Sequence, residues 1–447
     1  MRVLLCQSYL GAGSSEPQVF PLGLAYLASM IMEKHDLQCF DPNTSEDPFL
    51  ELRNIFEKLR PDVVGVSLRN VDSVFSFNKR SYYNPFVEII RTVRKEAPHA
   101  KLIVGGTGFS IFAKEIMKKN PEIDVGVVSE GEKTFSDLLE NINEPQKVKN
   151  LIIRKNDSLL STGKQELLNF ENLPAPSREQ FELKKYSEQP FAVGVQSKRG
   201  CVFGCIFCPS QSVWGCSFRL RSPKKVVDEI EDLINRLGIS SISFAESVFN
   251  SPIDYSRKIC QEIIDRKLHV SWAAAFNPAF INLESMKEAA KAGCELFSFS
   301  PDGASNRSLR LLGKNFDLAS VDRTIALTKK IDGVNVGYSF LYDLPFFNGE
   351  HVLGLVRLML KMKSLGSKLS FLSLSKIRVF PRTLIYEIAL NQGKISQNTN
   401  LLNPTFYESG SGLNPANFIP TALRDSIIVF HEFERKIGQG SDFKFCS

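Results

Sequence analysis

The stretch that decides the fold is FAVGVQSKRGCVFGCIFCP, residues 191–209. It begins with a mostly apolar run that favours a buried strand, and three cysteines then follow within eight positions, at Cys201, Cys205 and Cys208. Loops that follow parallel strands are where ligands gather in α/β proteins. Thiolates on one short loop are typical ligands of iron–sulfur clusters, and three of them leave the fourth iron of a cubane open. The stretch therefore predicts a strand followed by a [4Fe–4S] cluster site.

A zinc site is the alternative reading of this loop. Zinc usually takes four ligands, often from two separated cysteine pairs, and Cys216 lies eight residues after Cys208 as a possible fourth thiolate. The remaining cysteines are scattered through the chain, which argues against a disulfide framework and favours small buried or surface residues. They are Cys6, Cys39, Cys260, Cys294 and Cys446.

Downstream of the cysteines, apolar strand patterns alternate with helical patterns. Six strand–helix units of this kind predict a partial parallel barrel over residues 191–394, in which the cysteine loop follows the first strand. A tail with a helical pattern follows at 395–447. The expected strands are 191–197, 241–246, 270–276, 296–302, 334–343 and 369–380.

Upstream of the cysteines, residues 1–145 show a second alternating series. Its strands are apolar without alternation, which is typical of a parallel sheet covered on both faces, and this predicts a doubly wound, Rossmann-like α/β domain. Residues 146–190 break the rhythm and predict a small hairpin and a linker. The expected strands are 2–6, 37–41, 63–68, 101–106 and 125–130, and the expected helices are 21–34, 48–60, 84–97, 111–120 and 132–142.

The composition is that of an ordinary folded protein. The chain has 447 residues, 43% hydrophobic and 23% charged, with a formal net charge of +6 that by itself does not favour nucleic acid. No apolar run approaches the roughly 20 residues of a membrane span, and the first residues lack the features of a signal peptide. We therefore expect a cytoplasmic protein without a membrane span and without a nucleic-acid partner.

The cysteine spacing, with aromatic Phe207 just before the last cysteine, resembles the signature of the radical S-adenosylmethionine (SAM) superfamily. The resemblance implies that the open iron holds SAM and that one electron from the cluster cleaves SAM to a 5′-deoxyadenosyl radical. It assigns Glu246 to the methionine amino group, Ser298, Ser300 or Asp302 to the ribose or carboxylate, the Phe340 strand to the adenine side and Arg378 to a carboxylate. Lys314-Asn315 after the next helix also matches this family. The implied SAM contacts are Phe207, Glu246, Ser298, Ser300, Asp302, Phe340 and Arg378.

A Rossmann-like domain ahead of such a barrel resembles the cobalamin-binding class of radical SAM enzymes. The glycines at 105, 106 and 108 do not form G-x-G-x-x-G, which disfavours a dinucleotide. The D-x-H-x-x-G signature is absent, so no lower histidine ligand to cobalt is expected. The resemblance instead places Arg69 near the lower face of the cobalt. The implied cobalamin contacts are Leu22, Gly23, Ser67, Arg69, Asn70, Asp72, Gly105, Gly106, Gly108, Phe109, Ser110, Glu130 and Gly131.

The motifs are most similar to those of the tryptophan 2-methyltransferase and phosphinate P-methyltransferase subgroup. This implies transfer of a methyl group from SAM, via methylcobalamin, to an unactivated atom of a small molecule, with a flavodoxin- or ferredoxin-type protein as the external one-electron reductant. Two alternatives stay open. One is a non-methylating rearrangement or oxidative cyclisation on the same fold, and the other is a non-catalytic iron–sulfur and corrinoid sensor.

Overall fold

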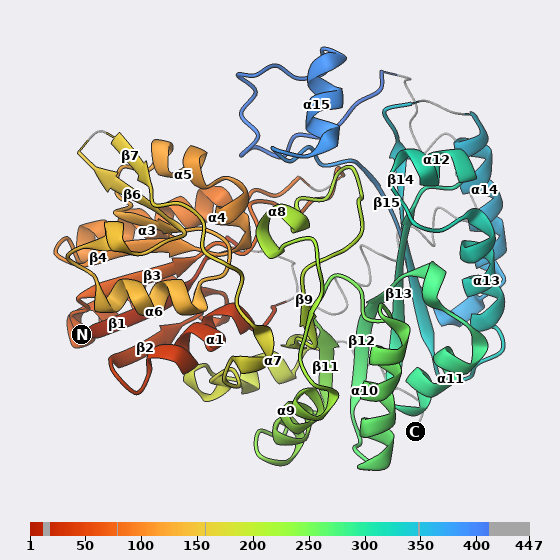
Figure 1. The fold of residues 1–447 in the computed structure, drawn as a ribbon, viewed down its shortest axis with the longest axis horizontal. Coiled ribbons are helices and arrows are strands. Elements are labelled where there is room, and N and C mark those ends of the chain that lie inside the picture. The colour runs from red at the N-terminus through yellow and green to blue at the C-terminus, as the bar shows by residue number, and fades with distance from the viewer. Residues whose placement is uncertain (12–17, 78, 157, 347–348, 411–447) are drawn as a thin grey trace.

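The computed structural model describes residues 1–11, 18–77, 79–156, 158–346 and 349–410. Figure 1 shows two α/β regions side by side, with the cysteine loop and the short helix α8 between them. The helix predicted in the tail beyond residue 410 lies outside the described residues. Among the described helices, none has the length and hydropathy needed to span a bilayer.

The N-terminal region is a seven-stranded sheet with strand order β2-β1-β3-β4-β5-β6-β7. Its first five strands are parallel, and the antiparallel hairpin predicted between the domains lies at the β5 edge of this sheet. The strands are β1 (Arg2–Gln7), β2 (Asp36–Phe40), β3 (Val63–Ser67), β4 (Lys101–Gly105), β5 (Val125–Val127), β6 (Leu151–Lys155) and β7 (Ser158–Ser161).

Helices pack on both faces of this sheet. One pair is formed by α1 and α6 and another by α2 and α3, which confirms the doubly wound architecture expected from the non-alternating strands. The helices are α1 (Leu22–Ile31), α2 (Pro48–Leu59), α3 (Tyr83–Glu96), α4 (Thr107–Ile111), α5 (Ala113–Lys119) and α6 (Glu132–Glu140).

The predicted loop after β4 is in fact helical. Helix α4 begins at Thr107, directly after Gly106, and a break at Phe112 separates it from α5. The amide of Gly108 donates to the carbonyls of Leu68 and Arg69, which lie in the loop after β3, at 2.9 and 2.8 Å. A Cβ at position 108 would lie 2.9 Å from the backbone of Asn70, so glycine here serves close packing of two backbones.

The second region is a six-stranded, all-parallel sheet in the order β15-β14-β13-β12-β11-β8, the predicted partial barrel. Its strands are β8 (Val193–Val195), β11 (Ser241–Phe244), β12 (Ser271–Phe276), β13 (Cys294–Asp302), β14 (Asn335–Asp343) and β15 (Leu369–Lys376), with a separate short pair β9 (Lys198–Arg199) and β10 (Arg219–Leu220). The helices are α7 (Lys184–Ser187), α8 (Ser210–Trp214), α9 (Pro223–Asn235), α10 (Ile253–Asp265), α11 (Leu283–Lys291), α12 (Asn306–Leu311), α13 (Leu318–Thr328), α14 (Gly349–Lys363) and α15 (Leu384–Asn391).

Several barrel helices begin where the sequence supplies a cap. Ser222 accepts a hydrogen bond from Lys225 ahead of α9, with Pro223 in the first turn. Asn282 and Ser305 each form a reciprocal capping box at the start of α11 and α12. These local signals explain why the helix positions were predictable from the sequence.

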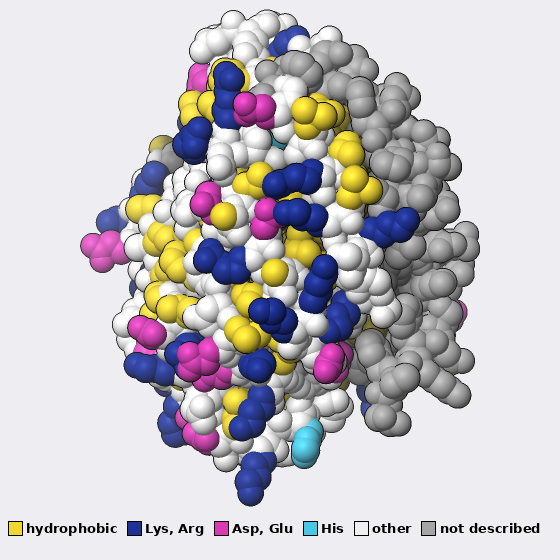
Figure 2. All heavy atoms as spheres, turned by 90° about the vertical axis from the view of Figure 1, so that its right-hand side faces the viewer, with side chains coloured by type: hydrophobic (Ala, Val, Ile, Leu, Met, Phe, Trp, Pro, Cys, Tyr) yellow, Lys and Arg dark blue, Asp and Glu magenta, His cyan; other side chains and the backbone are white. Residues whose placement is uncertain are grey.

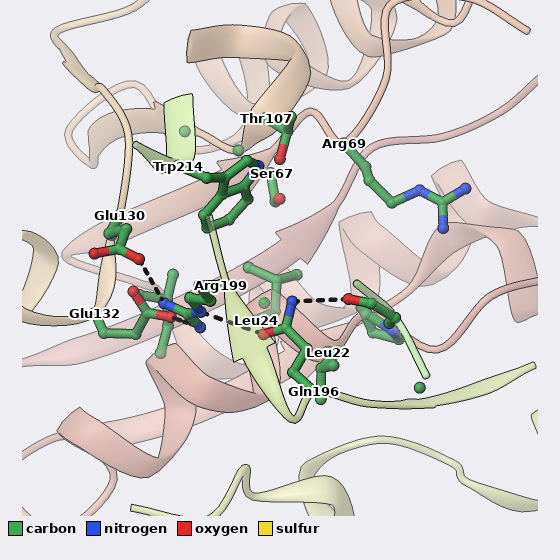
Figure 3. A pocket seen from close by; sticks show the side chains of 18 of the residues that line it. Leu22, Leu24, Ser67, Arg69, Thr107, Glu130, Glu132, Gln196, Arg199 and Trp214 are labelled. Atoms are coloured by element: carbon green, nitrogen blue, oxygen red, sulfur yellow. Dashed lines mark hydrogen bonds and ion pairs between the residues drawn. The ribbon is translucent and has the colours of Figure 1, made fainter. Parts of the chain in front are cut away.

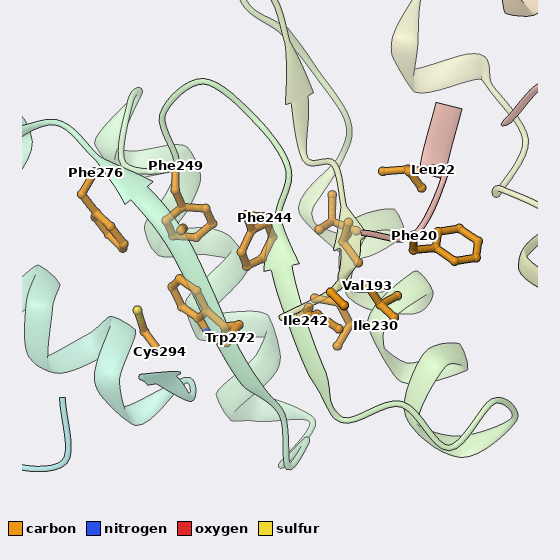
Figure 4. Packing of buried hydrophobic residues seen from close by; sticks show 14 of the residues in the cluster. Phe20, Leu22, Val193, Ile230, Ile242, Phe244, Phe249, Trp272, Phe276 and Cys294 are labelled. Atoms are coloured by element: carbon orange, nitrogen blue, oxygen red, sulfur yellow. The ribbon is translucent and has the colours of Figure 1, made fainter. Parts of the chain in front are cut away.

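The two sheets share one hydrophobic core. Phe20 and Leu22 at the start of α1 belong to the same buried cluster as Val193 of β8 and Phe244 of β11. Figure 4 shows this packing continuing through Trp272 and Phe276 on β12. The Phe20 amide also donates to the carbonyl of Ala192 at 3.0 Å, so the start of α1 is bonded to the first barrel strand.

The net positive charge is distributed over helix surfaces. Figure 2 shows many Lys and Arg side chains on the face formed by the helices at the far end of the barrel. Some of these cations pair locally, as Arg357 and Lys361 of α14 do with Asp322 of α13. Exposed pairs of this kind contribute little to stability.

Candidate functional site: a cavity between the two sheets

A cavity of about 550 Å³ lies between the two sheets. One wall is formed by the loops at the carboxyl ends of β3, β4 and β5, and the facing wall by β8, α8 and the end of β11. Eight of the predicted cobalamin contacts line it, which are Leu22, Gly23, Ser67, Arg69, Gly105, Gly106, Glu130 and Gly131.

Glycine gives the backbone of this wall its close approach. Gly106 has φ of 99°, and a Cβ there would lie 2.6 Å from the Leu68 carbonyl oxygen. A Cβ on Gly65, deeper in the cavity, would lie 3.0 Å from Leu5 and 3.2 Å from Phe135. Side chains at these positions would collide with the protein itself, so glycine lets the strands and loops of this wall pack closely.

Part of the cavity lining is apolar. Leu5, Leu27, Ile103, Val127 and Phe135 line the part inside the first sheet and its helices. A corrinoid carries a broad macrocycle with polar edges and a nucleotide arm that ends in an aromatic base. An apolar slot that opens onto glycine-rich loops matches both parts, so the residues present fit cobalamin.

The remaining predicted cobalamin contacts do not line the cavity. Phe109 is fully buried in the N-terminal core, and Ser110 accepts a hydrogen bond from the Ser129 amide at 2.9 Å. Gly108 packs on Asn70, and Asp72 pairs with Arg378. These residues hold in place the loops that line the cavity. The glycines after β4 had suggested an open loop, but helix α4 begins there instead.

Arg199, two residues before Cys201, lines the cavity. It is buried and pairs with Glu130 at 3.2 Å and with Glu132 at 2.5 Å. Its guanidinium also stacks near three rings, at 5.2 Å from Tyr26, 4.5 Å from Phe170 and 5.5 Å from Trp214. Figure 3 shows Arg199 between the acidic pair and Trp214.

Neighbouring arginines keep Glu130, on the loop after β5, in its ionised form. Burial opposes ionisation of Glu130, but hydrogen bonds from Arg219 and the charge of Arg199 hold its pKa below the usual value. Both carboxylate oxygens of Glu130 accept from Arg219, each at 2.8 Å. Sequence reasoning missed Arg199 and Trp214. Their signals were the position of Arg199 beside the cysteine loop and the scarcity of tryptophan, with two in the chain.

The three cysteines lie on the loop that connects β9 to α8. Cys201 is buried, Cys205 partly buried and Cys208 exposed. Burial raises the pKa of the Cys201 and Cys205 thiols, while the cation of Lys314 opposes the rise at both. Cluster assembly would deprotonate them, since thiolates are the ligands. Three thiolates on one loop fit a cubane with an open iron.

The zinc alternative requires ligands gathered around one ion. Among the described residues, no group of three or more His, Cys, Asp and Glu side chains stands close enough to share a single metal ion. Cys216 lies after α8 and is exposed. The same finding covers Cys201, Cys205 and Cys208, so the choice between zinc and a cluster rests on the family of the chain and not on this geometry.

Glu246 lies at the end of β11, lines the cavity and is buried. It accepts hydrogen bonds from the amide and hydroxyl of Ser197 at 2.8 and 2.7 Å and pairs with Lys198 at 3.4 Å. Burial raises the pKa of Glu246 and lowers that of Lys198. The carboxylate thus fixes the strand end just before the cysteine loop.

On the other side of the cysteine loop, Asp302 pairs with Lys314, which also donates to the Ser300 carbonyl at 3.1 Å. The Lys314 ammonium lies 5.4 Å from the ring of Phe207. A Cβ at Gly313 would lie 2.2 Å from the Gly204 carbonyl oxygen, so this segment packs directly on the cysteine loop. Ser298 is half-buried and Phe340 is buried, with Phe340 paired in register to Asp302.

Arg378, which follows β15, is held by partners within the protein. Its guanidinium is buried and donates to Asp72 and to the carbonyls of Val379, Leu401 and Thr405. These contacts engage the whole guanidinium, so the structure brings Arg378 to the loop after β3 and to the tail instead of to a ligand. Its position after β15 had suggested that it binds a carboxylate of a ligand. Its partner is instead Asp72, 306 positions away in the chain, and no sequence pattern indicates such a pair.

Comparison with known proteins identifies both regions. Residues 10–139 match the family model of the B12 binding domain, and residues 195–359 match that of the radical SAM superfamily. The chain is 27% identical over 380 residues to an uncharacterised methyltransferase of Pyrococcus horikoshii, covering 83% of this chain and 78% of the relative.

Two further likenesses are informative. The chain is 26% identical over 327 residues to an anaerobic magnesium-protoporphyrin IX monomethyl ester cyclase of Cereibacter sphaeroides, covering 70% of this chain and 52% of the cyclase. Its fold resembles that of the radical SAM methyltransferase TsrM from Kitasatospora setae, solved with tryptophan and a SAM analogue. That match has a TM-score of 0.77 at 21% identity and covers 94% of this chain and 82% of TsrM.

Proposed function

Because the chain belongs to the radical SAM enzymes that carry a B12-binding domain, we propose that it moves a methyl group from SAM to an unactivated atom of a small-molecule substrate. The observation that carries the proposal is the shared cavity. Loops of the B12-binding sheet form one of its walls, and the segment next to the cysteines forms the other. The methyltransferase relative from Pyrococcus horikoshii supports methyl transfer as the outcome.

Cys201, Cys205 and Cys208 would hold the [4Fe–4S] cluster, and the cavity would hold the corrinoid. When bound, these groups supply an open iron for the amino and carboxylate groups of SAM and a metal centre that can carry a methyl group. The protein binds and orients them and keeps water from the space between the sheets. We expect a flavodoxin- or ferredoxin-type reductant and a cytoplasmic setting.

The residues around the cysteine loop suggest how SAM is oriented. Lys314 is a buried cation beside Phe207 and is suited to an anionic group such as the SAM carboxylate. Glu246 and Ser247 line the cavity at the end of β11, where the amino group of SAM would find acceptors. Ser298 and Ser300 are candidates to bind the ribose of SAM. Asp302 would act indirectly, by holding Lys314 in place. Phe340 would contribute through the strand to which it belongs, which would lie on the adenine side.

Arg69 lines the corrinoid cavity and follows β3 by two residues. Arg69 would lie beside the bound corrinoid, where its fixed cation would disfavour a water ligand on the metal. Figure 3 shows its side chain extending from the same strand end as Ser67. Its charge also acts on buried Asp41.

The test is anaerobic reconstitution followed by turnover with methyl-labelled SAM. About four irons and one corrinoid per chain are expected after loading, and label is expected in the product. Label that stays out of the product while 5′-deoxyadenosine forms would refute methyl transfer. That result would favour the second candidate, an oxidative cyclisation, which the likeness to the magnesium-protoporphyrin ester cyclase supports.

A non-catalytic sensor is the remaining alternative. It requires that neither 5′-deoxyadenosine nor S-adenosylhomocysteine forms from SAM under reducing, anaerobic conditions with any substrate offered. Formation of either product excludes it.

A further inference from the structure

The cysteine loop and α8 form one closed unit. The side-chain amide of Gln211 donates to the carbonyls of Cys201 and Phe203, both at 3.0 Å. The Cys201 amide donates in turn to the Gly215 carbonyl at 3.2 Å. Because Gln211 lies within α8, any ligand that fixes the cysteines also fixes this helix.

The same helix is part of the cavity wall. Ser210 and Trp214, at its two ends, both line the cavity. Figure 3 shows the Trp214 ring standing between Arg199 and the side chains of Ser67 and Thr107, which come from the facing wall. Ser210 also accepts from the Cys208 thiol at 3.1 Å. One short segment therefore borders the cluster site and the corrinoid cavity.

A second bond ties this segment to the B12-binding region. The Ser129 hydroxyl donates to the Val213 carbonyl at 2.6 Å, and Ser129 itself lines the cavity with a left-handed φ of 68°. A path of direct contacts thus runs from Cys201 through Gln211 and Val213 to the loop after β5.

The protein alone buries little of this unit, although the Ile206 amide donates to the Leu312 carbonyl at 3.2 Å and the Ile206 carbonyl accepts from the Ile385 amide at 3.0 Å. From Cys201 to Ser217, only Cys201 and Val213 are buried, and Val202 is 47% exposed. A segment with so little buried surface opens locally at a small free-energy cost. Three coordinate bonds to a cluster would supply the missing constraint, because metal binding to an incompletely ordered site adds its own ordering free energy.

We propose that assembly of the cluster on Cys201, Cys205 and Cys208 strengthens corrinoid binding, with Gln211 and Ser129 as the positioning residues that carry the coupling. The inference rests on the proposed function, since it concerns the same two cofactors. Coupling between binding sites is reciprocal, so the bound corrinoid stabilises the cluster by the same factor. Loading of the enzyme is then cooperative, and the half-loaded protein is the less populated form.

The experiment measures the Kd of hydroxocobalamin by anaerobic ultrafiltration, for cluster-free and for reconstituted protein. We expect the reconstituted chain to bind about ten-fold more tightly, within the usual range of couplings between sites. Gln211→Ala removes the donor from an exposed side chain, and the ratio of the two Kd values should fall to about two or less. Ser129→Ala should reduce the ratio in the same direction.

Gln261→Ala is the matched control. Gln261 is an exposed glutamine on α10 whose amide donates to Asp265 at 2.6 Å, remote from the cysteine loop, and its ratio should equal that of the parent. Circular dichroism of the cluster-free protein establishes that the comparison is made on folded chains.

Equal Kd values for the cluster-free and reconstituted parent chain would overturn the inference while leaving the proposed function intact. A ratio that survives Gln211→Ala would overturn the assigned path. If the parent chain binds no corrinoid in either state, the proposed function itself fails.

Discussion

The loops after β3, β4 and β5 and the loop that carries the cysteines face the same cavity, but they are held in different ways. The first set is fixed by the protein: Gly108 bonds to the loop after β3, Ser110 bonds to Ser129, and Glu130 pairs with buried Arg199 and partly buried Arg219. In the cysteine loop and α8, residues 201–217, only Cys201 and Val213 are buried, and the other residues are partly buried or exposed. One wall of the site is therefore organised by the fold, and the other depends more on its cofactor.

Loss of a cysteine should have the largest effect on the difference between the two walls. Cys205→Ala is expected to reduce bound iron from about four per chain to near zero, because the remaining two thiolates cannot hold a cubane. Iron assay and visible absorbance measure the loss. The N-terminal wall should persist, so corrinoid binding should weaken without vanishing.

Cys216→Ala is the control for this change and should keep its iron. Cys216 is exposed and follows α8. If Cys216→Ala loses the metal as completely as Cys205→Ala does, the site has four thiolate ligands and leaves no open iron for SAM.

Arg199→Met should show how much the fixed wall relies on buried charge. It leaves Glu132 without its arginine partner and Glu130 with one of two. Removing one member of a buried ionic network costs roughly 3–5 kcal/mol in the free energy of unfolding. Urea denaturation measures it.

The comparison variant is Arg236→Met, which breaks an exposed pair with Asp232 on α9. Such pairs contribute about 0–1 kcal/mol. Equal destabilisation by the two variants would show that the Arg199 network is not what holds this wall.

Acid should weaken the barrel through His351. Burial lowers the pKa of His351 to about 4. Its Nδ1 accepts from the Ala304 amide at 3.1 Å, and its Nε2–H donates to the Leu341 carbonyl at 2.8 Å, so the folded state holds the neutral ring. The unfolded chain takes up a proton near pH 6.5, so stability falls as the pH drops from there towards 4, by up to about 3 kcal/mol.

The measurement is the free energy of unfolding against pH for the parent chain and for His351→Gln. The variant should be less stable at neutral pH and should lose this part of the acid dependence. An unchanged slope between pH 6 and pH 4 would show that His351 does not titrate as a buried neutral ring.

The smallest effect is expected at the loop from residue 69 to 83. Ser76 accepts from the Lys376 amide at 3.1 Å and its own amide donates to Ser375 at 3.2 Å, which docks this loop on β15. Ser76→Ala should cost about 1 kcal/mol or less and speed hydrogen exchange in the loop only. Faster exchange in the cysteine loop as well would mean that the two walls are less independent than the contacts indicate.

The order of elements was readable from the sequence because it rests on local patterns. Apolar runs without alternation, capped helices and a cysteine loop directly after a strand each depend on neighbours a few positions away. The family matches confirm the B12-binding and radical SAM regions that these patterns indicated. The domain boundaries at 145, 190 and 394 remain predictions, although the hairpin at 151–161 joins the first sheet.

Individual contacts were less readable. Gly108, Phe109 and Ser110 looked like loop residues at a ligand, but they lie in α4 and support the wall from behind. Arg378 looked like a ligand residue and instead bonds Asp72 and the tail. The sequence analysis assigned no role to Arg199, but its pair with Glu130 joins the cysteine segment to the loop after β5.

What the sequence alone determined about this protein is the pair of α/β regions, the three cysteines and the loops at the strand ends, because periodicity and spacing are properties of the chain itself. Only the tertiary structure decided which strand-end residues face a common cavity and which hold others in place. Those assignments depend on side chains from 67 to 306 positions apart meeting in space. A charged group is paired with a buried partner or left free for a ligand according to which side chains surround it in space, and not according to its neighbours in the chain.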